Sequence, residues 1–185
     1  VEKKEGQLKY KGVIYNIVDL PGTYSLGAFS EDEVVARDFI IKGNPDVVIN
    51  VIDATNIERN LYLTTQLMEM GTKVIIALNM MDEAKAKNID IDLEKLSKNL
   101  GVPVIATVAA KRKGIDTLIK RAVEYVEEDK YSYNPISYGE NIDKEIDEIK
   151  RLLEGSNIEY PNNWIAIKAL EGDKDVLNRL SDNTS

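Results

Sequence analysis

Apolar and polar positions along the chain alternate in blocks that predict strands and helices in turn, as far as about residue 130. Continuous apolar runs such as VVINVI and VIIALN are typical of strands that a parallel sheet buries on both faces. The expected strands are 7–10, 13–19, 46–53, 73–79 and 102–108, and the expected helices are 32–41, 56–70, 91–101 and 114–128. This order predicts a three-layer α/β domain with a mostly parallel sheet.

The first two strands differ from the others, because only the polar pair Lys11 and Gly12 separates them. Two residues between two strand-like segments predict a tight hairpin turn and therefore one antiparallel edge strand. The second strand of the hairpin is expected to end at Asp19.

After residue 130 the pattern changes. A segment rich in Tyr, Ser and Pro has no clear period and predicts a linker, and only helical patterns follow it. Four apolar residues fall on one face of the first of these helices: Ile142, Ile146, Ile149 and Leu153. We therefore expect an α/β domain over 1–130, a linker over 131–139 and a small all-helical appendage over 140–185.

The composition removes several classes of chemistry. The chain contains no Cys and no His, which excludes thiol nucleophiles, disulfides, His-based triads and the usual zinc sites. A formal net charge of -8 argues against nucleic acid as a partner, since nucleic acid is bound by basic patches. No apolar run is long enough to cross a bilayer, and the first residues lack a signal-peptide pattern, so the composition predicts a cytosolic location.

Polar residues follow the expected strands at their carboxyl ends, where open α/β sheets bind ligands. Asp19 is followed three positions later by Gly22, and such a pair can hold Mg²⁺ through water while the glycine N–H faces a terminal phosphate. The N-x-x-D sequence from Asn79 to Asp82 follows a later strand. The Asp82 carboxylate can accept from the ring N–H and the amino group of guanine together, whereas adenine lacks this pair of donors. Asn79 is expected to tie the neighbouring loops together.

Each of these motifs is weak when taken alone. D-x-P-G is also a common turn sequence, and N-x-x-D occurs by chance in most chains of this length. Their order and placement, each at the end of a strand of one expected sheet, favour a guanine-nucleotide site. A nicotinamide site has little support, because no G-x-G-x-x-G follows a strand.

Longer strings resemble a known family. DLPGTYSLGAFSEDEVVARDFI, DATNIERNLYLTTQLMEMG and NMMDEAKAKNIDID resemble the G domain of the prokaryotic ferrous iron transport protein B family, and NNWIAIKALEGD is similar to its helical, GDI-like spacer. The resemblance implies a P-loop GTPase-type fold that binds GTP or GDP with Mg²⁺. It also implies slow GTP hydrolysis that regulates ferrous iron uptake, at the cytoplasmic side of the cell membrane, with the transmembrane portion of the same transporter as partner.

Within this resemblance, Asp19 and Gly22 match the phosphate and Mg²⁺ motif, and 23–34 matches the nucleotide-sensing switch. Gly22 and Thr23 are therefore the candidate catalytic residues. Thr23 stands where Ras-like enzymes carry the Gln that positions water, so hydrolysis is expected to be slow.

The resemblance also assigns the residues that contact the base. Asn79 and Asp82 match the base-specificity motif, and Met80 stands where many GTPases have Lys, so it is expected to pack on the base without adding charge. Three further residues match the loop whose backbone contacts guanine: Val108, Ala109 and Ala110.

One part of the family pattern would lie before Val1, namely the G-x-x-x-x-G-K-[ST] loop with its strand. That loop cradles the phosphates, so the chain alone is expected to be inactive. In this fold its strand lies between the strands that end at Asp19 and Asp53. Both neighbours are therefore expected to have unpaired edges and exposed apolar faces.

Two other interpretations remain open. The chain can be a nucleotide-independent interaction or regulatory module whose helical part binds a partner. It can also be a ribosome-associated GTPase, which the acidic surface and the helical tail disfavour. A requirement for a monovalent cation and a homo-oligomeric state stay open as well.

The other notable side chains receive structural interpretations. Asn56 is expected to cap the helix that follows it, and Trp164 is expected to lie in the core of the tail with Ile167 and Leu170. The basic cluster 111–113 is interpreted as a solvated loop, with steering of phosphate as the alternative. Three tyrosines of the linker are expected to pack the tail against the α/β domain: Tyr131, Tyr133 and Tyr138.

Overall fold

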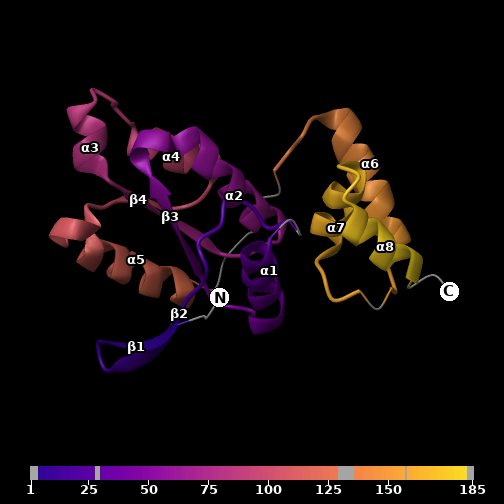
Figure 1. Cartoon of the computed structure of the whole chain (residues 1–185), viewed down its shortest axis with the longest axis horizontal. Helices are drawn as coiled ribbons and strands as arrows, with labels where there is room; N and C mark the ends of the chain where they lie inside the picture. The colour runs from indigo at the N-terminus through magenta and orange to yellow at the C-terminus, as the bar shows by residue number, and fades with distance from the viewer. Residues whose placement is uncertain (1–3, 28–29, 129–135, 157, 183–185) are drawn as a thin grey trace. The chain divides into compact units, whose positions relative to one another are not determined.

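A β-hairpin opens the first of two compact units in the computed structural model, which describes residues 4–27, 30–128, 136–156 and 158–182 (Figure 1). β1 (Lys4–Tyr10) pairs antiparallel with β2 (Val13–Asp19). Lys11 and Gly12 have φ values of 48° and 87°, which is the left-handed geometry that a two-residue hairpin turn of this kind requires. The predicted hairpin is confirmed.

Helix α1 (Glu31–Gly43) completes this unit, and local sequence determines both of its ends. The Ser30 hydroxyl accepts from the Glu33 N–H at 3.2 Å, and the Glu33 carboxylate accepts from the Ser30 N–H at 3.3 Å. This reciprocal cap stabilises a helix start by about 1 kcal/mol. Asn44, with a φ of 41°, ends the helix in the left-handed region.

The second unit begins at Pro45 with a parallel sheet in the order β3-β4-β5. Its strands are β3 (Val48–Asp53), β4 (Val74–Asn79) and β5 (Val104–Ala106). Helix α4 (Leu93–Leu100) precedes β5. Strand, helix and strand thus follow one another as the sequence predicts.

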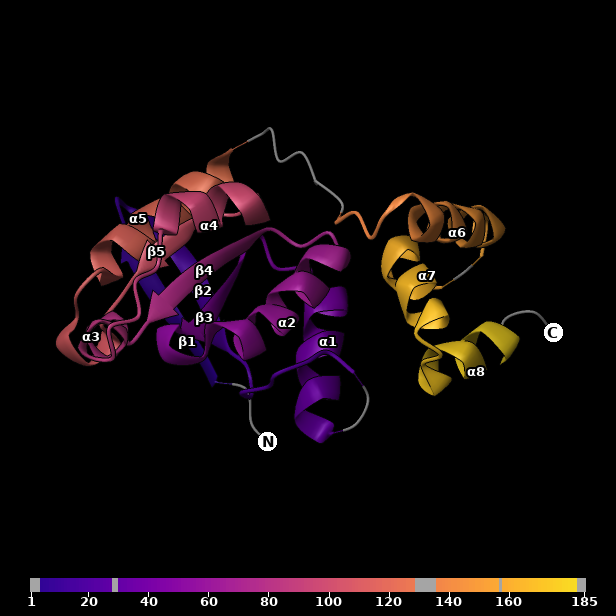
Figure 2. The ribbon, with the colours of Figure 1, turned by 90° about the horizontal axis from the view of Figure 1, so that it is seen from above.

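The core of the second unit lies on both faces of β4. Figure 2 shows α2 (Ile57–Glu69) on one face of the sheet and α5 (Ile115–Glu127) on the other. Ile75 and Ala77 of β4 pack against α5, in a cluster completed by Leu118, Ala122 and Tyr125. The residues between them, Ile76 and Leu78, are also fully buried. Burial on both faces explains the continuous apolar run of this strand.

The strands form two sheets, the hairpin and the three parallel strands, instead of one mixed sheet. Apolar side chains on one strand of each sheet are exposed: Val13, Ile14 and Ile17 of β2, and Ile49 and Val51 of β3. Val51 retains 63% of its accessible surface. The expected exposed apolar faces are confirmed, as is the α/β class with a parallel sheet, an antiparallel pair and helices.

Three short helices were not predicted. α3 (Met81–Ala86) has a single buried residue, Ala84, and therefore shows no apolar period in the sequence. The 3-10 helices η1 (Ala54–Asn56) and η2 (Ala109–Lys111) are each a single turn. All three lie just after the carboxyl ends of strands.

The helical tail consists of α6 (Glu140–Leu152), α7 (Asn162–Leu170) and α8 (Lys174–Asp182). Ile146 packs with Ala166 and Ile167, as the predicted face requires, and Ile149 borders this cluster. No described helix is long and apolar enough to span a membrane.

Two residues that were expected in the core of the tail lie outside it. Ile142 is 48% exposed and Leu170 is 45% exposed. Ile142 is in the first turn of the 13-residue α6, and Leu170 ends the nine-residue α7. Because α7 is shorter than α6, it does not cover the first turn of α6, where Ile142 lies.

Trp164 lies in the core of the tail, which confirms its predicted role. It is 1% exposed and stacks on Tyr160, with ring centroids 5.3 Å apart and ring planes at 16°. The guanidinium of Arg179 lies 5.2 Å from the centre of the Tyr160 ring. An aromatic pair with a cation over it joins α7 and α8 to the connecting segment.

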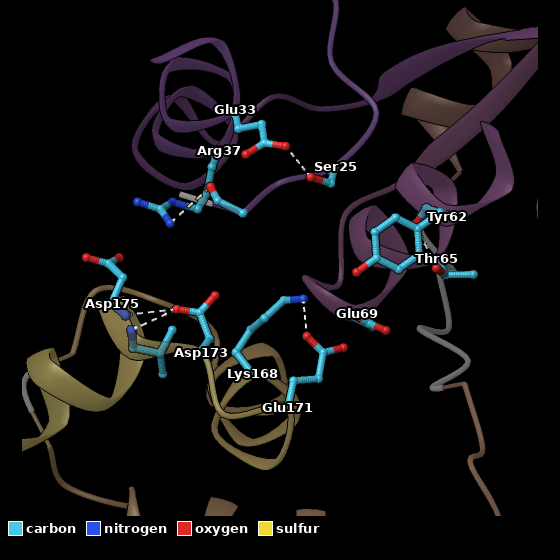
Figure 3. A network of polar contacts seen from close by, with 12 residues as sticks. Ser25, Glu33, Arg37, Tyr62, Thr65, Glu69, Lys168, Glu171, Asp173 and Asp175 are labelled. Atoms are coloured by element: carbon cyan, nitrogen blue, oxygen red, sulfur yellow. Dashed lines mark hydrogen bonds and ion pairs between the residues drawn. The ribbon is translucent and has the colours of Figure 1, made fainter. Parts of the chain in front are cut away.

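The end of α2 contacts the segment before α6 and the first turn of α7. The Tyr138 hydroxyl donates to the Glu69 carboxylate, and the Asn163 side chain donates to the Glu69 carbonyl at 3.3 Å. Glu69 is buried, and this burial raises the pKa of its carboxyl group. Lys168, also buried, forms an ion pair with Glu171 at 2.6 Å (Figure 3). Tyr138 thus contacts α2 of the α/β part, as predicted, through its hydroxyl, whereas Tyr131 and Tyr133 lie outside the described residues.

Candidate functional site

β3 and β4 end level with each other, with Asp53 opposite Asn79. The Asp53 carboxylate accepts from the Thr55 N–H at 2.7 Å and from the Asn56 side chain at 3.3 Å. The Thr55 N–H lowers the pKa of Asp53. Asn56 occupies the N-cap position of α2, as expected, but within the described part of the chain its side chain makes no capping hydrogen bond. Its amide donates to Asp53, which caps η1 instead.

Asn79 joins the end of β4 to the loop after β5. Its side-chain oxygen accepts from the Ala109 N–H at 2.9 Å and from the Thr107 hydroxyl at 3.3 Å. The Thr107 N–H also donates to the Leu78 carbonyl at 2.8 Å. Three hydrogen bonds therefore hold these two strand ends together.

Met80 turns the chain from β4 into α3. Its φ of 62° places a non-glycine residue in the left-handed region, which is unfavourable by roughly 1 kcal/mol. Asp82 follows in the first turn of α3, where the helix dipole favours a negative charge. The Asp82 carboxylate also accepts from the Glu83 N–H at 3.1 Å.

Residues 107–114, which we call the base loop, have a closely fixed backbone. Val108 and Lys113 exchange two backbone hydrogen bonds, of 3.0 and 3.2 Å, around the turn η2. Arg112 has a φ of 53° and Gly114 a φ of 79°. A Cβ at Gly114 would lie 2.2 Å from the Ala106 carbonyl oxygen, so only glycine fits there.

An ion pair connects the base loop to α3. The Lys111 ammonium lies 2.6 Å from the Asp82 carboxylate, with side chains that are 60% and 38% exposed. The hydrogen bond from Lys111 lowers the pKa of Asp82, and the Asp82 carboxylate raises the pKa of Lys111. Asp82 is therefore ionised at neutral pH.

The other predicted residues belong to the first unit. Asp19 is the exposed last residue of β2. Among the described residues, no atom lies within 4 Å of the position that a Cβ would take on Gly22, so its backbone is approachable. The Thr23 hydroxyl donates to the Ser25 carbonyl at 2.7 Å, and the Ser25 hydroxyl donates to Glu33 of α1 (Figure 3). These bonds connect the segment after β2 to the start of α1.

The structure thus places the predicted base residues together in the second unit: Asn79, Met80, Asp82, Val108, Ala109 and Ala110. The predicted phosphate residues Asp19, Gly22 and Thr23 follow one another at the end of β2 in the first unit. Sequence reasoning missed the partner of Lys111, and the opposite charges on the two segments were its only signal. Among the described residues, no group of three or more Asp and Glu side chains could hold a metal ion.

A parallel α/β sheet with these motifs at its strand ends is the architecture of a G domain, the GTP-binding module of GTPases. Residues 1–122 match the family model described as ferrous iron transport protein B, and residues 138–185 match the model of the FeoB cytosolic helical domain. The chain therefore belongs to the ferrous iron transport protein B family.

Known relatives support this assignment at the level of sequence and of structure. The Fe(2+) transporter FeoB of Escherichia coli (strain K12) is 40% identical over 94% of this chain. This chain spans 23% of that relative's length. The cytosolic domain of the T. maritima FeoB iron transporter in a GDP form is 40% identical, with a TM-score of 0.90 over 97% of this chain and 71% of that structure. The FeoB G domain of Methanococcus jannaschii is 54% identical, with a TM-score of 0.67 over 69% of this chain and 81% of that structure.

Proposed function

We propose that this chain is the guanine-nucleotide-binding part of a ferrous iron transporter, in which GTP binding and slow hydrolysis regulate iron uptake. Residues 1–130 would form the G domain, 131–139 the linker and 140–185 the helical domain. The part would work at the cytoplasmic side of the membrane against the transmembrane portion of the same protein. The relatives named as Fe(2+) transporters, and the T. maritima structures in GDP and GMPPNP forms, support this proposal.

The observation that carries the proposal is the junction of Asn79, Asp82 and the base loop. The Asp82 carboxylate is ionised and offers two oxygens, so it can accept both the ring N–H and the amino group of guanine. Asn79 holds the base loop, so the backbone of Val108, Ala109 and Ala110 would line the base edge. Met80 would supply apolar packing on the ring. Adenine offers no matching donors and would leave the carboxylate unpaired.

The phosphates and Mg²⁺ are assigned to the segment after β2. Asp19 provides an exposed carboxylate, the hard oxygen donor that Mg²⁺ prefers, and the open backbone of Gly22 lets its N–H approach a terminal phosphate. Bound Mg²⁺ would neutralise charge on the phosphates. Thr23 has a hydroxyl where Ras-like enzymes have the carboxamide of Gln, and that hydroxyl already donates to the Ser25 carbonyl. Slow hydrolysis follows if Thr23 orients the attacking water weakly.

The test is Asp82→Asn in the intact transporter, with GDP, ADP and xanthosine diphosphate titrated by calorimetry. We expect the wild type to bind GDP and not ADP. The variant should bind GDP about 100-fold more weakly, because two charge-assisted hydrogen bonds are lost. Xanthosine diphosphate should bind the variant better than GDP does, since its ring carbonyl can accept from the new amide.

Asp90→Asn is the matched control, because it makes the same chemical change at an exposed residue outside the junction. It should leave GDP affinity unchanged. Equal binding of GDP and ADP by the wild type, or an Asp82→Asn variant with unchanged GDP affinity, would reject guanine recognition at this site. The nucleotide-independent interaction module would then be the better interpretation.

A further inference from the structure

The ion pair between Lys111 and Asp82 occupies the carboxylate that would receive the base. Lys111 approaches one oxygen of Asp82 at 2.6 Å, and the other oxygen accepts from the Glu83 N–H at 3.1 Å. A guanine that binds with two N–H groups needs both oxygens. A bound guanine and the Lys111 ammonium would therefore need the same oxygen of Asp82 as acceptor.

The backbone of the base loop delivers Lys111 to this position. Lys111 is the last residue of η2, which begins at Ala109, and the Ala109 N–H is bonded to Asn79. The Lys111 N–H donates to the Val108 carbonyl at 2.9 Å. Because the loop is tied at its start and closed by the pairing of Val108 with Lys113, the stem of Lys111 starts from a fixed point near α3.

We propose that Lys111 competes with guanine for the Asp82 carboxylate, which weakens nucleotide binding and speeds nucleotide release. This inference rests on the proposed function. The competition is modest, because both side chains are partly exposed and water screens their attraction. Asp82 is an ionised carboxylate at neutral pH with or without this contact, so it can accept from the base whenever Lys111 leaves.

The test is Lys111→Met in the intact protein, which removes the charge and keeps a stem of similar length. Dissociation constants of GDP and guanosine are measured by calorimetry, and GDP release by stopped flow. We expect both ligands to bind about threefold more tightly and release to slow by a similar factor, which corresponds to the loss of one exposed ion pair. The difference from wild type should shrink at high salt, which screens the pair.

Two variants serve as controls. Lys113→Met removes the same charge from the same loop, at a residue whose backbone pairs with Val108, and should not tighten guanosine binding. Lys111→Arg keeps the charge and should bind GDP as the wild type does. In an Asp82→Asn background probed with xanthosine diphosphate, Lys111→Met should have no effect, because its partner is gone.

The outcomes separate this inference from the function on which it rests. Wild-type protein that fails to prefer GDP over ADP would reject both. A wild type that prefers GDP, with Lys111→Met leaving guanosine affinity unchanged, would reject the competition alone. Weaker GDP binding with unchanged guanosine binding would show that Lys111 attracts phosphate, which also rejects the competition.

Discussion

Gly114 is the residue at which the base loop tolerates least change. Its φ of 79° is unfavourable for any other residue, and an added Cβ would lie 2.2 Å from a backbone oxygen that β5 holds in place. We expect Gly114→Ala to lower the free energy of unfolding by about 2–4 kcal/mol, because both the turn and its neighbour must move. Urea denaturation followed by far-UV circular dichroism measures this loss.

Gly101→Ala is the matched control for this prediction. Gly101 has a similar φ of 71°, but no described atom lies within 4 Å of the position of its Cβ. Its replacement should therefore lower the stability by only about 1 kcal/mol, from backbone strain alone. Equal losses at the two glycines would contradict a steric role for Gly114.

Those parts of the candidate site that consist of residues close together in the chain can be predicted from the sequence. Asp19 and Gly22, or Asn79 and Asp82, can be read from a strand end and a gap of three residues. The contact of Lys111 cannot, since its partner is 29 residues away and is reached only through the pairing of β4 with β5. The left-handed turn that brings Asp82 into place depends on the same tertiary contacts.

At the scale of elements, Ile146 is the residue of α6 that is buried against α7. It is 6% exposed and packs on Ala166 and Ile167. Ile146→Ala should lower the stability of the tail by about 2–4 kcal/mol, through lost burial and the cavity left behind. The fluorescence of Trp164, the only tryptophan of the chain, reports this transition during urea denaturation.

The same helix supplies the control in Ile142, which is 48% exposed. Ile142→Ala should change the stability by less than about 1 kcal/mol, since little surface is uncovered and no cavity forms. If the two substitutions were equivalent, the assignment of the α6–α7 core would be incorrect.

Glu69 makes the junction of α2 with Tyr138 and Asn163 sensitive to pH. Burial raises the pKa of Glu69 in the folded state above its unfolded value. Its contribution to stability is therefore fully present below the unfolded pKa and is lost as the pH rises through the folded pKa. Glu69→Gln removes this titration and keeps an acceptor for the Tyr138 hydroxyl.

We therefore expect the melting temperature of Glu69→Gln, relative to that of the wild type, to increase as the pH rises from about 4 to about 8. Differential scanning calorimetry at several pH values measures this difference. Glu148→Gln on the exposed side of α6 should show no such trend. A difference that stays constant, or falls with rising pH, would mean that burial does not dominate the environment of Glu69.

The long elements agree with the sequence because their burial is regular. β4 is apolar from Val74 to Leu78 because helices cover both of its faces, and α1 starts where SEDE can form a reciprocal cap. α3 was not predicted from the sequence for the opposite reason, because only one of its six residues, Ala84, is buried and the helix therefore has no apolar period. Its position is set by Met80 and by the contacts of β4 with β5.

At the scale of the whole molecule, alternation alone predicts an α/β fold and does not predict two sheets. The structure has the hairpin β1-β2 as one sheet and β3-β4-β5 as another. The exposed apolar residues of β2 and β3, such as Ile14 and Val51, have the composition of buried strands.

The tie between Asn79 and Ala109 also bears on synthesis, since a ribosome delivers the chain from its amino end. When β4 has emerged, Asn79 and Asp82 are present, but the backbone group that orders Asn79 is still thirty residues away in the chain. Under the proposed function, the site for the base would therefore be incomplete when β4, the strand before the N-x-x-D sequence, has folded. Under the proposed function, recognition of guanine would require that the base loop has left the exit tunnel and that β5 has joined the sheet. A nascent chain that ends earlier would contain Asn79 and Asp82 without the ordered base loop.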